Sequence, residues 1–232
     1  MTPAALADIG ACIFDAYGTL LDVHSAMARH AARIGADWQA LSLAWRQKQI
    51  DYTRLRTMSG RTAPFDQITA DGLDAAAERL GVHLTAPQRR ELLTAYETLA
   101  PHPEVRVALE ALAATGMRLG VLSNGTPAML RTAISAAGLA PLLPIVLSVD
   151  AVHAYKTAAA AYQLGPEAFA LPVGDIGFVS SNAWDAVGAT WFGYRVFWVN
   201  RVREPMERLG VSPEATGRSL ADVGSWVTSA RA

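Results

Sequence analysis

The sequence predicts an α/β fold: a doubly wound, Rossmann-like parallel sheet as the core domain, with an inserted helical cap domain. Two observations support this prediction. Short apolar runs bounded by turn residues alternate with helical patterns over most of the chain. One stretch, residues 23–100, shows helical patterns but no strand-like run. We therefore expect a core domain of residues 1–22 and 101–232 and a cap domain of residues 23–100.

Five apolar runs have the length and composition of buried parallel strands. They are Ile9–Phe14, Leu119–Leu122, Ile145–Val149, Ile176–Val179 and Val196–Val199. Helical spacing is found between the last four runs and elsewhere, in Pro127–Ala137, Ala158–Phe169, Trp184–Trp191, Glu104–Ala114 and, within the expected cap domain, Trp38–Met58. Ligands of such sheets bind beyond the carboxyl ends of the strands. The polar residues that follow the strands are therefore the candidates for a functional site.

The composition excludes several classes of function. The chain has 232 residues, of which 51% are hydrophobic, so it is too apolar for a disordered protein. Its 20 basic and 21 acidic residues give a net charge of −1, which provides no general attraction to nucleic acid or anionic lipid. The uncharged stretch Thr132–Val149 is interrupted by Gly138, Pro141 and Pro144, so it does not read as a membrane span. We expect a soluble protein without a nucleic-acid or membrane partner.

The cysteine content and the N-terminus favour the cytoplasm. Cys12 is the single cysteine, so neither an intrachain disulfide nor a cysteine-based zinc site can form. The first residues, Met1–Gly10, lack the basic start and long apolar centre of a signal peptide. We therefore expect a cytoplasmic location.

Polar side chains with catalytic chemistry follow four of the expected strands. They are Asp15 after the first strand, Ser123 and Asn124 after the second, Lys156 just after the third, and Ser180, Ser181, Asn182 and Asp185 after the fourth. An aspartate at such a turn often does no more than cap it. Here the partners stand at the ends of other parallel strands, which meet at one edge of the sheet. We therefore expect Asp15 to belong to an active site.

The segments around these residues are similar to those of the haloacid dehalogenase superfamily, and within it to those of the L-2-haloacid dehalogenases. The resemblance spans nearly the whole chain and rests on Phe14–Ser25, Trp45–Gln49, Leu122–Gly125, Leu147–Ala151, Tyr155–Lys156 and Phe178–Asp185. It implies an enzyme that hydrolyses short L-2-haloalkanoic acids to D-2-hydroxy acids through an ester on an aspartate, without a cofactor. Relatives of this kind commonly form homodimers, so a homodimer is the expected assembly.

The resemblance also implies roles for the catalytic residues. Asp15 attacks the carbon that bears the halogen, with Lys156 as its counter-ion and Thr19 as a hydrogen-bond donor that orients it. The residues expected to hold Lys156 and to position the hydrolytic water are Asp185, Ser180 and Asn182, with Tyr162 in the same network.

Substrate recognition follows from the two negative charges of the reaction, the carboxylate of the haloacid and the departing halide. The resemblance implies that Ser123 and the backbone amides near Ala16 and Tyr17 bind the substrate carboxylate. It also implies that Arg46, Asn124 and the ring edge of Trp184 bind the departing halide. The apolar wall of the site is expected to consist of Tyr17, Gln47, Ile50 and Phe65.

The residues near Asp15 do not suit a metal. Most members of the superfamily are magnesium phosphatases, which carry a second aspartate two residues after the nucleophile and acidic residues in the last motif. This chain has Tyr17 at the first of these positions, and Ser180 and Asn182 at the others. A phenol, with an ordinary pKa of about 10, replaces a carboxylic acid poorly, and magnesium prefers carboxylate oxygens. The five histidines show no ligand spacing either, so we expect no metal site.

Two alternatives stay open at this point. A phosphatase of the same superfamily would release phosphate in a magnesium-dependent reaction. A non-catalytic binding module on the same scaffold would bind a ligand without converting it. The sequence departs from the family pattern at Thr157, where a proline usually follows the lysine. The loop that presents Lys156 therefore lacks the constraint of a proline ring.

Overall fold

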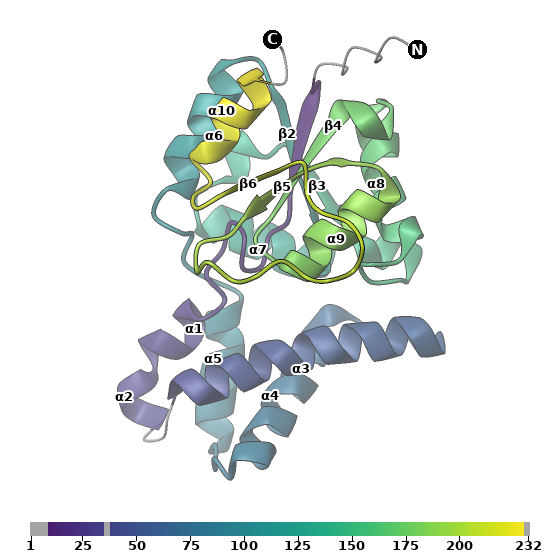
Figure 1. Ribbon diagram of the computed structural model, residues 1–232. Coiled ribbons are helices and arrows are strands. Elements are labelled where there is room, and N and C mark those ends of the chain that lie inside the picture. Colours follow the sequence, from purple (N-terminus) through teal and green to yellow (C-terminus); the bar gives the residue numbers. More distant parts are fainter. Residues whose placement is uncertain (1–8, 35–37, 230–232) are drawn as a thin grey trace.

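A fully parallel, six-stranded sheet forms the centre of the computed structural model, which describes residues 9–34 and 38–229 (Figure 1). The strand order is β3-β2-β1-β4-β5-β6. The strands are β1 Ala11–Phe14, β2 Arg118–Ser123, β3 Ile145–Ser148, β4 Ile176–Ser180, β5 Arg195–Val199 and β6 Ala215–Gly217. The predicted doubly wound α/β core is thereby confirmed. The expected domain ends 1–8 and 230–232, and residues 35–37 of the expected cap, lie outside the described residues.

β1 is the central strand, and its position brings the site together. It pairs in parallel with β2 on one side and with β4 on the other, so that Phe14 lies beside Val121 and Val179. All four residues of β1 are buried, which explains their continuous apolar character. The residue that follows β1 therefore emerges between the carboxyl ends of β2 and β4, where the strand order reverses.

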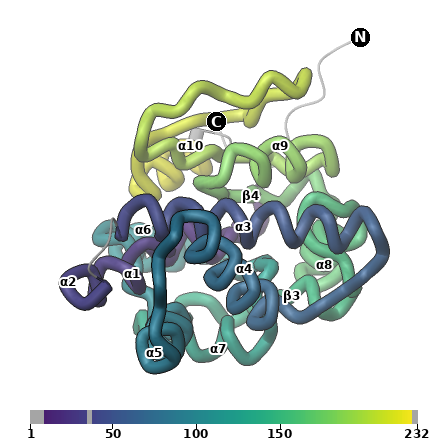
Figure 2. The backbone as a smooth tube through the Cα atoms, turned by 90° about the horizontal axis from the view of Figure 1, so that it is seen from below, coloured from purple at the N-terminus to yellow at the C-terminus, as the bar shows by residue number. Residues whose placement is uncertain are grey.

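Helices cover both faces of the sheet: α6 and α10 lie on one side, and α8 and α9 on the other (Figures 1 and 2). The helices that pack around the sheet are α6 Val105–Ala114, α7 Pro127–Ala136, α8 Ala159–Phe169, α9 Ala183–Phe192 and α10 Asp222–Ser229. Short 3₁₀ turns occupy Ala140–Leu142, Val149–Val152 and Val173–Asp175. We call the sheet with these helices the core.

Five further helices form a separate layer beyond the carboxyl edge of the sheet, which we call the cap. They are α1 Ser25–Arg29, α2 Ala31–Ile34, α3 Trp38–Ser59, α4 Phe65–Leu80 and α5 Ala86–Tyr96. The long helix α3 crosses the molecule below the core, as the view from the cap side shows (Figure 2). Trp45 of α3 donates a hydrogen bond to the carbonyl of Thr69 in α4 over 2.7 Å. That bond fixes which side of α3 faces the core.

The two segments that connect the cap with the core lie side by side. The N–H of Asp22 donates to the carbonyl of Ala100 over 2.8 Å, and the N–H of His102 donates to the carbonyl of Leu20 over 3.1 Å. An antiparallel bridge joins Leu21 to Pro101 between them. The cap is therefore attached to the core through one narrow, hydrogen-bonded pair of segments.

Several elements differ from the expected ones. The first strand begins at Ala11 rather than Ile9, because the N–H of Gly10 donates to the carbonyl of Asp175 in a loop. The strand β6 and the helix α10 were not expected, and of the helices in the expected helical stretch 23–100 only α3 had been given bounds. In the described part of the chain, no helix combines the length and the apolar character needed to cross a bilayer.

Candidate active site

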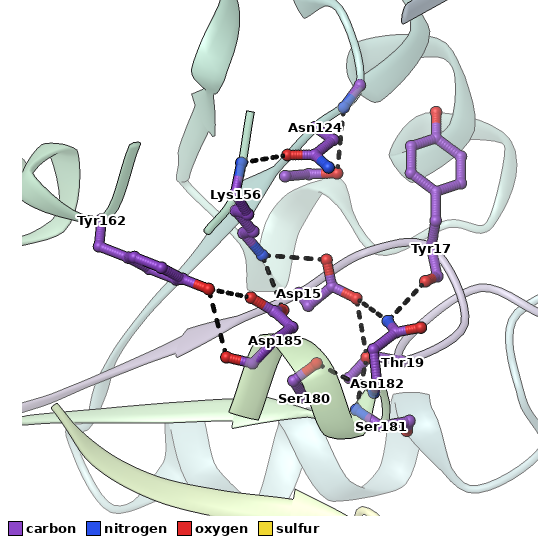
Figure 3. A network of polar contacts seen from close by, with 12 residues as sticks. Asp15, Tyr17, Thr19, Asn124, Lys156, Tyr162, Ser180, Ser181, Asn182 and Asp185 are labelled. Carbon is purple, nitrogen blue, oxygen red and sulfur yellow. Dashed lines mark hydrogen bonds and ion pairs between the residues drawn. The ribbon is translucent and has the colours of Figure 1, made fainter. Parts of the chain in front are cut away.

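Asp15 stands at the carboxyl end of β1, and both of its carboxylate oxygens are engaged (Figure 3). Lys156 Nζ lies 3.1 Å from Oδ1. Thr19 Oγ1 and Asn182 Nδ2 donate to Oδ2 over 3.0 and 2.8 Å. The side chain is 8% exposed. Three donors from separate segments thus hold one carboxylate in a fixed orientation at the edge of the sheet.

Lys156 joins Asp15 to a second, fully buried carboxylate. Its Nζ lies 3.0 Å from Asp185 Oδ2, at the start of α9, and 4.9 Å from the centre of the Phe178 ring. Tyr162 of α8 donates to Asp185 Oδ1 over 2.7 Å. Burial raises the pKa of Asp185 above its ordinary value, while Lys156 and the Tyr162 hydroxyl oppose that rise. A single ammonium group therefore compensates two carboxylates in the protein interior.

The loop after β3 carries Lys156 into this position. The N–H of Lys156 donates to Asn124 Oδ1 over 3.1 Å, and the N–H of Ala158 donates to the carbonyl of Tyr155 over 2.9 Å. The methyl group of Thr157 packs so closely on α9 that a Cβ at Gly188 would lie 2.6 Å from it. These contacts hold the loop although threonine stands where a proline was expected.

Two turns pack against each other beside Asp15 and fix Asn182. The Ser181 N–H donates to Thr19 Oγ1 over 2.8 Å, and the Asn182 N–H donates to Ser180 Oγ over 3.1 Å. Asn182 Nδ2 also donates to the carbonyl of Tyr17 over 3.2 Å. Because the Thr19 oxygen already accepts from Ser181, its proton is directed to Asp15.

Arg46 is the cation that the cap places in the site. It lies on α3, and its Nη2 donates to the carbonyl of Tyr17 over 3.0 Å and to Asn182 Oδ1 over 3.2 Å. The turn that it approaches contains Gly18, whose φ of 91° lies in the left-handed region that favours glycine. The cap thus contacts the same two turns that hold Asp15.

A small cavity lies between the cap and the sheet edge, and Asp15 is one of the residues that line it. It is lined by Asp15, Tyr17, Arg46, Gln49, Ile50, Thr53, Phe65, Ser123, Asn124 and Trp184. The open space amounts to about 10 Å³, which corresponds to about one water molecule. Ser123 is buried, and its Oγ accepts from the Gly125 N–H over 3.3 Å, so its own proton can be donated into the cavity.

The structure brings most of the expected residues together. Eight of the lining residues were expected there, and Thr19, Lys156, Tyr162, Ser180, Asn182 and Asp185 surround Asp15 as described above. Ala16 follows Asp15 and is buried. The expectation for Gln47 is wrong: its side chain is exposed and donates to Asp51 Oδ1 over 2.8 Å. The cavity takes Gln49 and Thr53 instead.

The spacing on α3 explains that error and could have prevented it. Neighbouring helical residues point in different directions, whereas residues three, four and seven apart share a face. Counted from Arg46, the same face carries Gln49, Ile50 and Thr53, and Gln47 does not belong to it.

Two further residues, Arg201 and Tyr155, support the site although no role in it was expected for them. Arg201 donates to the carbonyl of Thr19 over 2.9 Å and to Ser181 Oγ over 2.6 Å, and it pairs with Glu104. It therefore ties the two turns beside Asp15 to the start of α6. Tyr155 donates through its hydroxyl to the carbonyl of Ala63, which links the loop of Lys156 to the cap.

Two buried polar atoms of the described residues lack a hydrogen-bond partner, and both belong to residues that line the cavity: Tyr17 Oη and Trp184 Nε1. Burial raises the pKa of Tyr17 well above its ordinary value, so its phenol stays neutral. An unpaired buried donor is costly unless a ligand accepts from it. These atoms therefore point to a ligand with acceptor groups.

The arrangement suits a nucleophilic carboxylate acting on an anionic ligand. Within residues 9–34 and 38–229, no group of three His, Cys, Asp or Glu side chains could hold a metal ion. The residues that line the cavity combine the Asp15 carboxylate with side-chain donors that include those of Arg46, Ser123, Asn124 and Trp184. Such donors stabilise negative charge, both on a bound carboxylate and on a leaving anion.

Comparisons with known proteins agree with this geometry. Residues 9–193 match the family model of haloacid dehalogenase-like hydrolases. An (S)-2-haloacid dehalogenase of Pseudomonas sp. (strain YL) is 41% identical over 90% of both chains. The crystal structure of the L-2-haloacid dehalogenase RSc1362 superposes with a TM-score of 0.93 at 46% identity, over 95% of this chain and 99% of that one. The L-2-haloacid dehalogenase of Xanthobacter autotrophicus with covalently bound chloropropionic acid gives a TM-score of 0.89 at 30% identity, over 95% and 98%.

Replacement of the buried lysine is expected to destabilise the fold strongly. Lys156→Ala leaves Asp15 and Asp185 without their shared cation, and removal of one partner from a buried ion pair costs about 3–5 kcal/mol. The matched control is Lys48→Ala on α3, which removes the same charge from a half-buried residue and is expected to change stability by less than about 0.5 kcal/mol. Urea unfolding at neutral pH measures both. Equal losses in the two variants would contradict the central place of Lys156.

Proposed function

The chain belongs to the haloacid dehalogenase-like hydrolase family, and we propose that it hydrolyses short L-2-haloalkanoic acids to D-2-hydroxy acids. The observation that carries the proposal is the setting of Asp15. Its carboxylate lines a small cavity, and Lys156, Thr19 and Asn182 hold it in one orientation. A carboxylate fixed in this way is prepared for attack on an electrophilic carbon.

In the first step, an oxygen of Asp15 forms a bond to C2 of the substrate while the bond between C2 and the halogen breaks. The halide leaves from the opposite side with the bonding electron pair, so C2 is inverted. This step forms an ester on Asp15 and needs no proton for the leaving group. Arg46, Asn124 and the Nε1–H of Trp184 are the donors that we assign to the departing halide.

In the second step, water attacks the carbonyl carbon of the Asp15 ester. The bond between that carbon and the product oxygen breaks, and the 2-hydroxy acid takes up one proton of the water. The oxygen of the water stays in the Asp15 carboxylate, and the remaining proton is released when the carboxylate ionises. We assign the placement of this water to Asn182 and Ser180, with Asp185 and Tyr162 holding Lys156 in place.

We assign the substrate carboxylate to the hydroxyl of Ser123 and to the backbone amides that follow Asp15, at Ala16 and Tyr17. The apolar wall consists of Tyr17, Ile50 and Phe65, extended by Thr53. Tyr17 packs on Tyr96 and Phe65 with ring centres 5.5 and 5.6 Å apart, so this wall is stiff. A stiff wall around a small cavity favours short side chains on C2.

Halide release from L-2-chloropropionate is expected to be indifferent to EDTA, because Lys156 supplies the cation beside Asp15. The D-enantiomer is expected to release far less halide. The measurement is chloride release with and without chelator, with magnesium-dependent release of phosphate from a phosphomonoester assayed in parallel. Loss of dehalogenation with EDTA and its return with magnesium would contradict the proposal. Phosphate release would favour a phosphatase, and ligand binding without any turnover would favour a binding module.

The path of the solvent oxygen distinguishes a nucleophilic Asp15 from a general base. A single turnover with enzyme in excess, run in ¹⁸O-labelled water, is expected to place the label in Asp15 and not in the product. Mass spectrometry of the hydroxy acid and of the peptide that contains Asp15 measures this. Label in the 2-hydroxyl group, with none in Asp15, would rule out the ester while the dehalogenase function would stand. Stereochemistry cannot decide the question, since both routes invert C2.

We further propose that the protein is a cytoplasmic homodimer. Three exposed apolar side chains on α3, Leu43, Leu55 and Met58, support a protein contact there. The single, buried cysteine, Cys12, is consistent with a reducing compartment. Sedimentation equilibrium is expected to give the mass of two chains. The mass of one chain, over the whole range of concentrations tested, would contradict the dimer.

A further inference from the structure

The indole of Trp184 is held between the two layers of the protein. Its edge lines the cavity on the core side, where the buried Nε1–H has no hydrogen-bond partner. On the cap side, the guanidinium of Arg54 lies over the ring, with its central carbon 5.4 Å from the ring centre. A cation at that distance over an indole face is attracted by the π electrons. The ring is therefore in contact with the cap although it belongs to the core helix α9.

The position of Arg54 on α3 connects this contact to the cavity. Arg46, Ile50 and Arg54 follow one another at intervals of four residues, so they form one stripe along the helix. The first two line the cavity, and Arg54 continues the stripe beyond it. Because one rigid helix carries all three side chains, the approach of the cap that places Arg46 in the site also places Arg54 on Trp184.

We propose that Arg54 is a positioning residue that acts through Trp184 on the halide leaving from the cavity. This inference rests on the proposed function, in which the Nε1–H of Trp184 donates to that halide. The guanidinium on the ring face restrains the ring and keeps the Nε1–H directed into the cavity. It also draws electron density from the indole, which makes the N–H a better donor to an anion.

Arg54 itself does not line the cavity, and it is exposed to solvent. An exposed arginine on a helix is ordinarily a solvated residue whose removal changes little. The experiment must therefore separate an effect that passes through Trp184 from a general effect of surface charge or of cap stability. Halide affinity is the suitable readout, because it can be measured without turnover.

The test measures bromide binding to the intact protein by quenching of tryptophan fluorescence. Arg54→Ala is expected to weaken bromide binding about fivefold, the loss of about 1 kcal/mol that a cation–π contact of this kind carries. Arg54→Lys is expected to restore part of the affinity, because the ammonium can also lie over the ring. The control is Arg79→Ala, which removes an equal charge from an exposed residue of cap helix α4 and is expected to leave bromide binding unchanged.

A double-mutant cycle shows whether the effect passes through the indole. Loss of quenching in Trp184→Phe identifies Trp184 as the quenched tryptophan, so in this background bromide binding is measured as inhibition of chloride release. There, Arg54→Ala is expected to change the inhibition constant of bromide less than twofold. In the wild-type background, kcat is expected to fall more than KM for 2-chloropropionate rises. Thermal melts of all variants show whether each is folded. If Arg54→Ala melts at a lower temperature than the wild type, Arg54→Gln takes its place in the cycle.

Three results would overturn the inference. They are wild-type bromide affinity in Arg54→Ala, an equal loss in Arg79→Ala, and an Arg54→Ala effect that persists undiminished in the Trp184→Phe background. Failure of the proposed function looks different, because the wild-type protein would then release no halide from either enantiomer of 2-chloropropionate. An active wild type with bromide binding insensitive to Arg54 contradicts this inference alone.

Discussion

The buried ammonium of Lys156 between Asp15 and Asp185 is the interaction on which the site depends. Two carboxylates this far from solvent would repel each other and lose their hydration. A single cation 3.1 and 3.0 Å from them offsets both penalties, but only while all three groups keep their positions. The surrounding hydrogen bonds maintain those positions. Tyr162 donates to the second carboxylate, and Thr19 and Asn182 donate to the first.

The order of the strands makes this arrangement possible. Asp15 follows β1, Lys156 follows β3, and Asn182 and Asp185 follow β4. The strands β3, β2, β1 and β4 are consecutive in the sheet, so their carboxyl ends lie along one edge, and the loop after β3 is joined to the segment after β2 by the hydrogen bond from the Lys156 N–H to Asn124. Because β1 lies between the other two, its aspartate is accessible to donors from both sides. A parallel sheet with this strand order therefore assembles the charge cluster without any contribution from the cap.

The core part of the site could be predicted from the sequence for this reason. Buried parallel strands show as apolar runs, and the polar residues that end them must meet at one edge. The strand β6 could not be found in this way, because its residues Ala215–Gly217 are only partly buried at the sheet edge and include no large apolar side chain. The helix α10 packs against α6 far from any motif, which local periodicity does not reveal.

The cap side of the site was harder to predict, because contacts between layers leave little trace in the sequence. Gln47 was expected in the wall on the strength of its place in a motif, whereas the face that α3 presents contains Gln49 and Thr53. Arg54 and Arg201 have the appearance of ordinary surface arginines. Arg54 and its partner Trp184, and Arg201 and its partner Thr19, are more than a hundred residues apart in the sequence. Only the folded chain shows that these side chains lie against residues of the site.

The small volume of the cavity has a consequence for how the layers move. A space of about one water molecule is smaller than a 2-haloacid, so under the proposed function the cap and the core would have to separate to admit the substrate. The hydrogen bonds between the connecting segments at Asp22 and Ala100 can persist during such a movement. The contacts of Arg46 with Tyr17 and Asn182, of Tyr155 with Ala63, and of Arg54 with Trp184 cannot. The contacts between the cap and the core thus include those of Arg46 and Trp184, two of the residues to which the proposed function assigns the halide. Under the proposed function, separation of the cap from the core would therefore withdraw Arg46 from the halide and Arg54 from the ring of Trp184 in the same step.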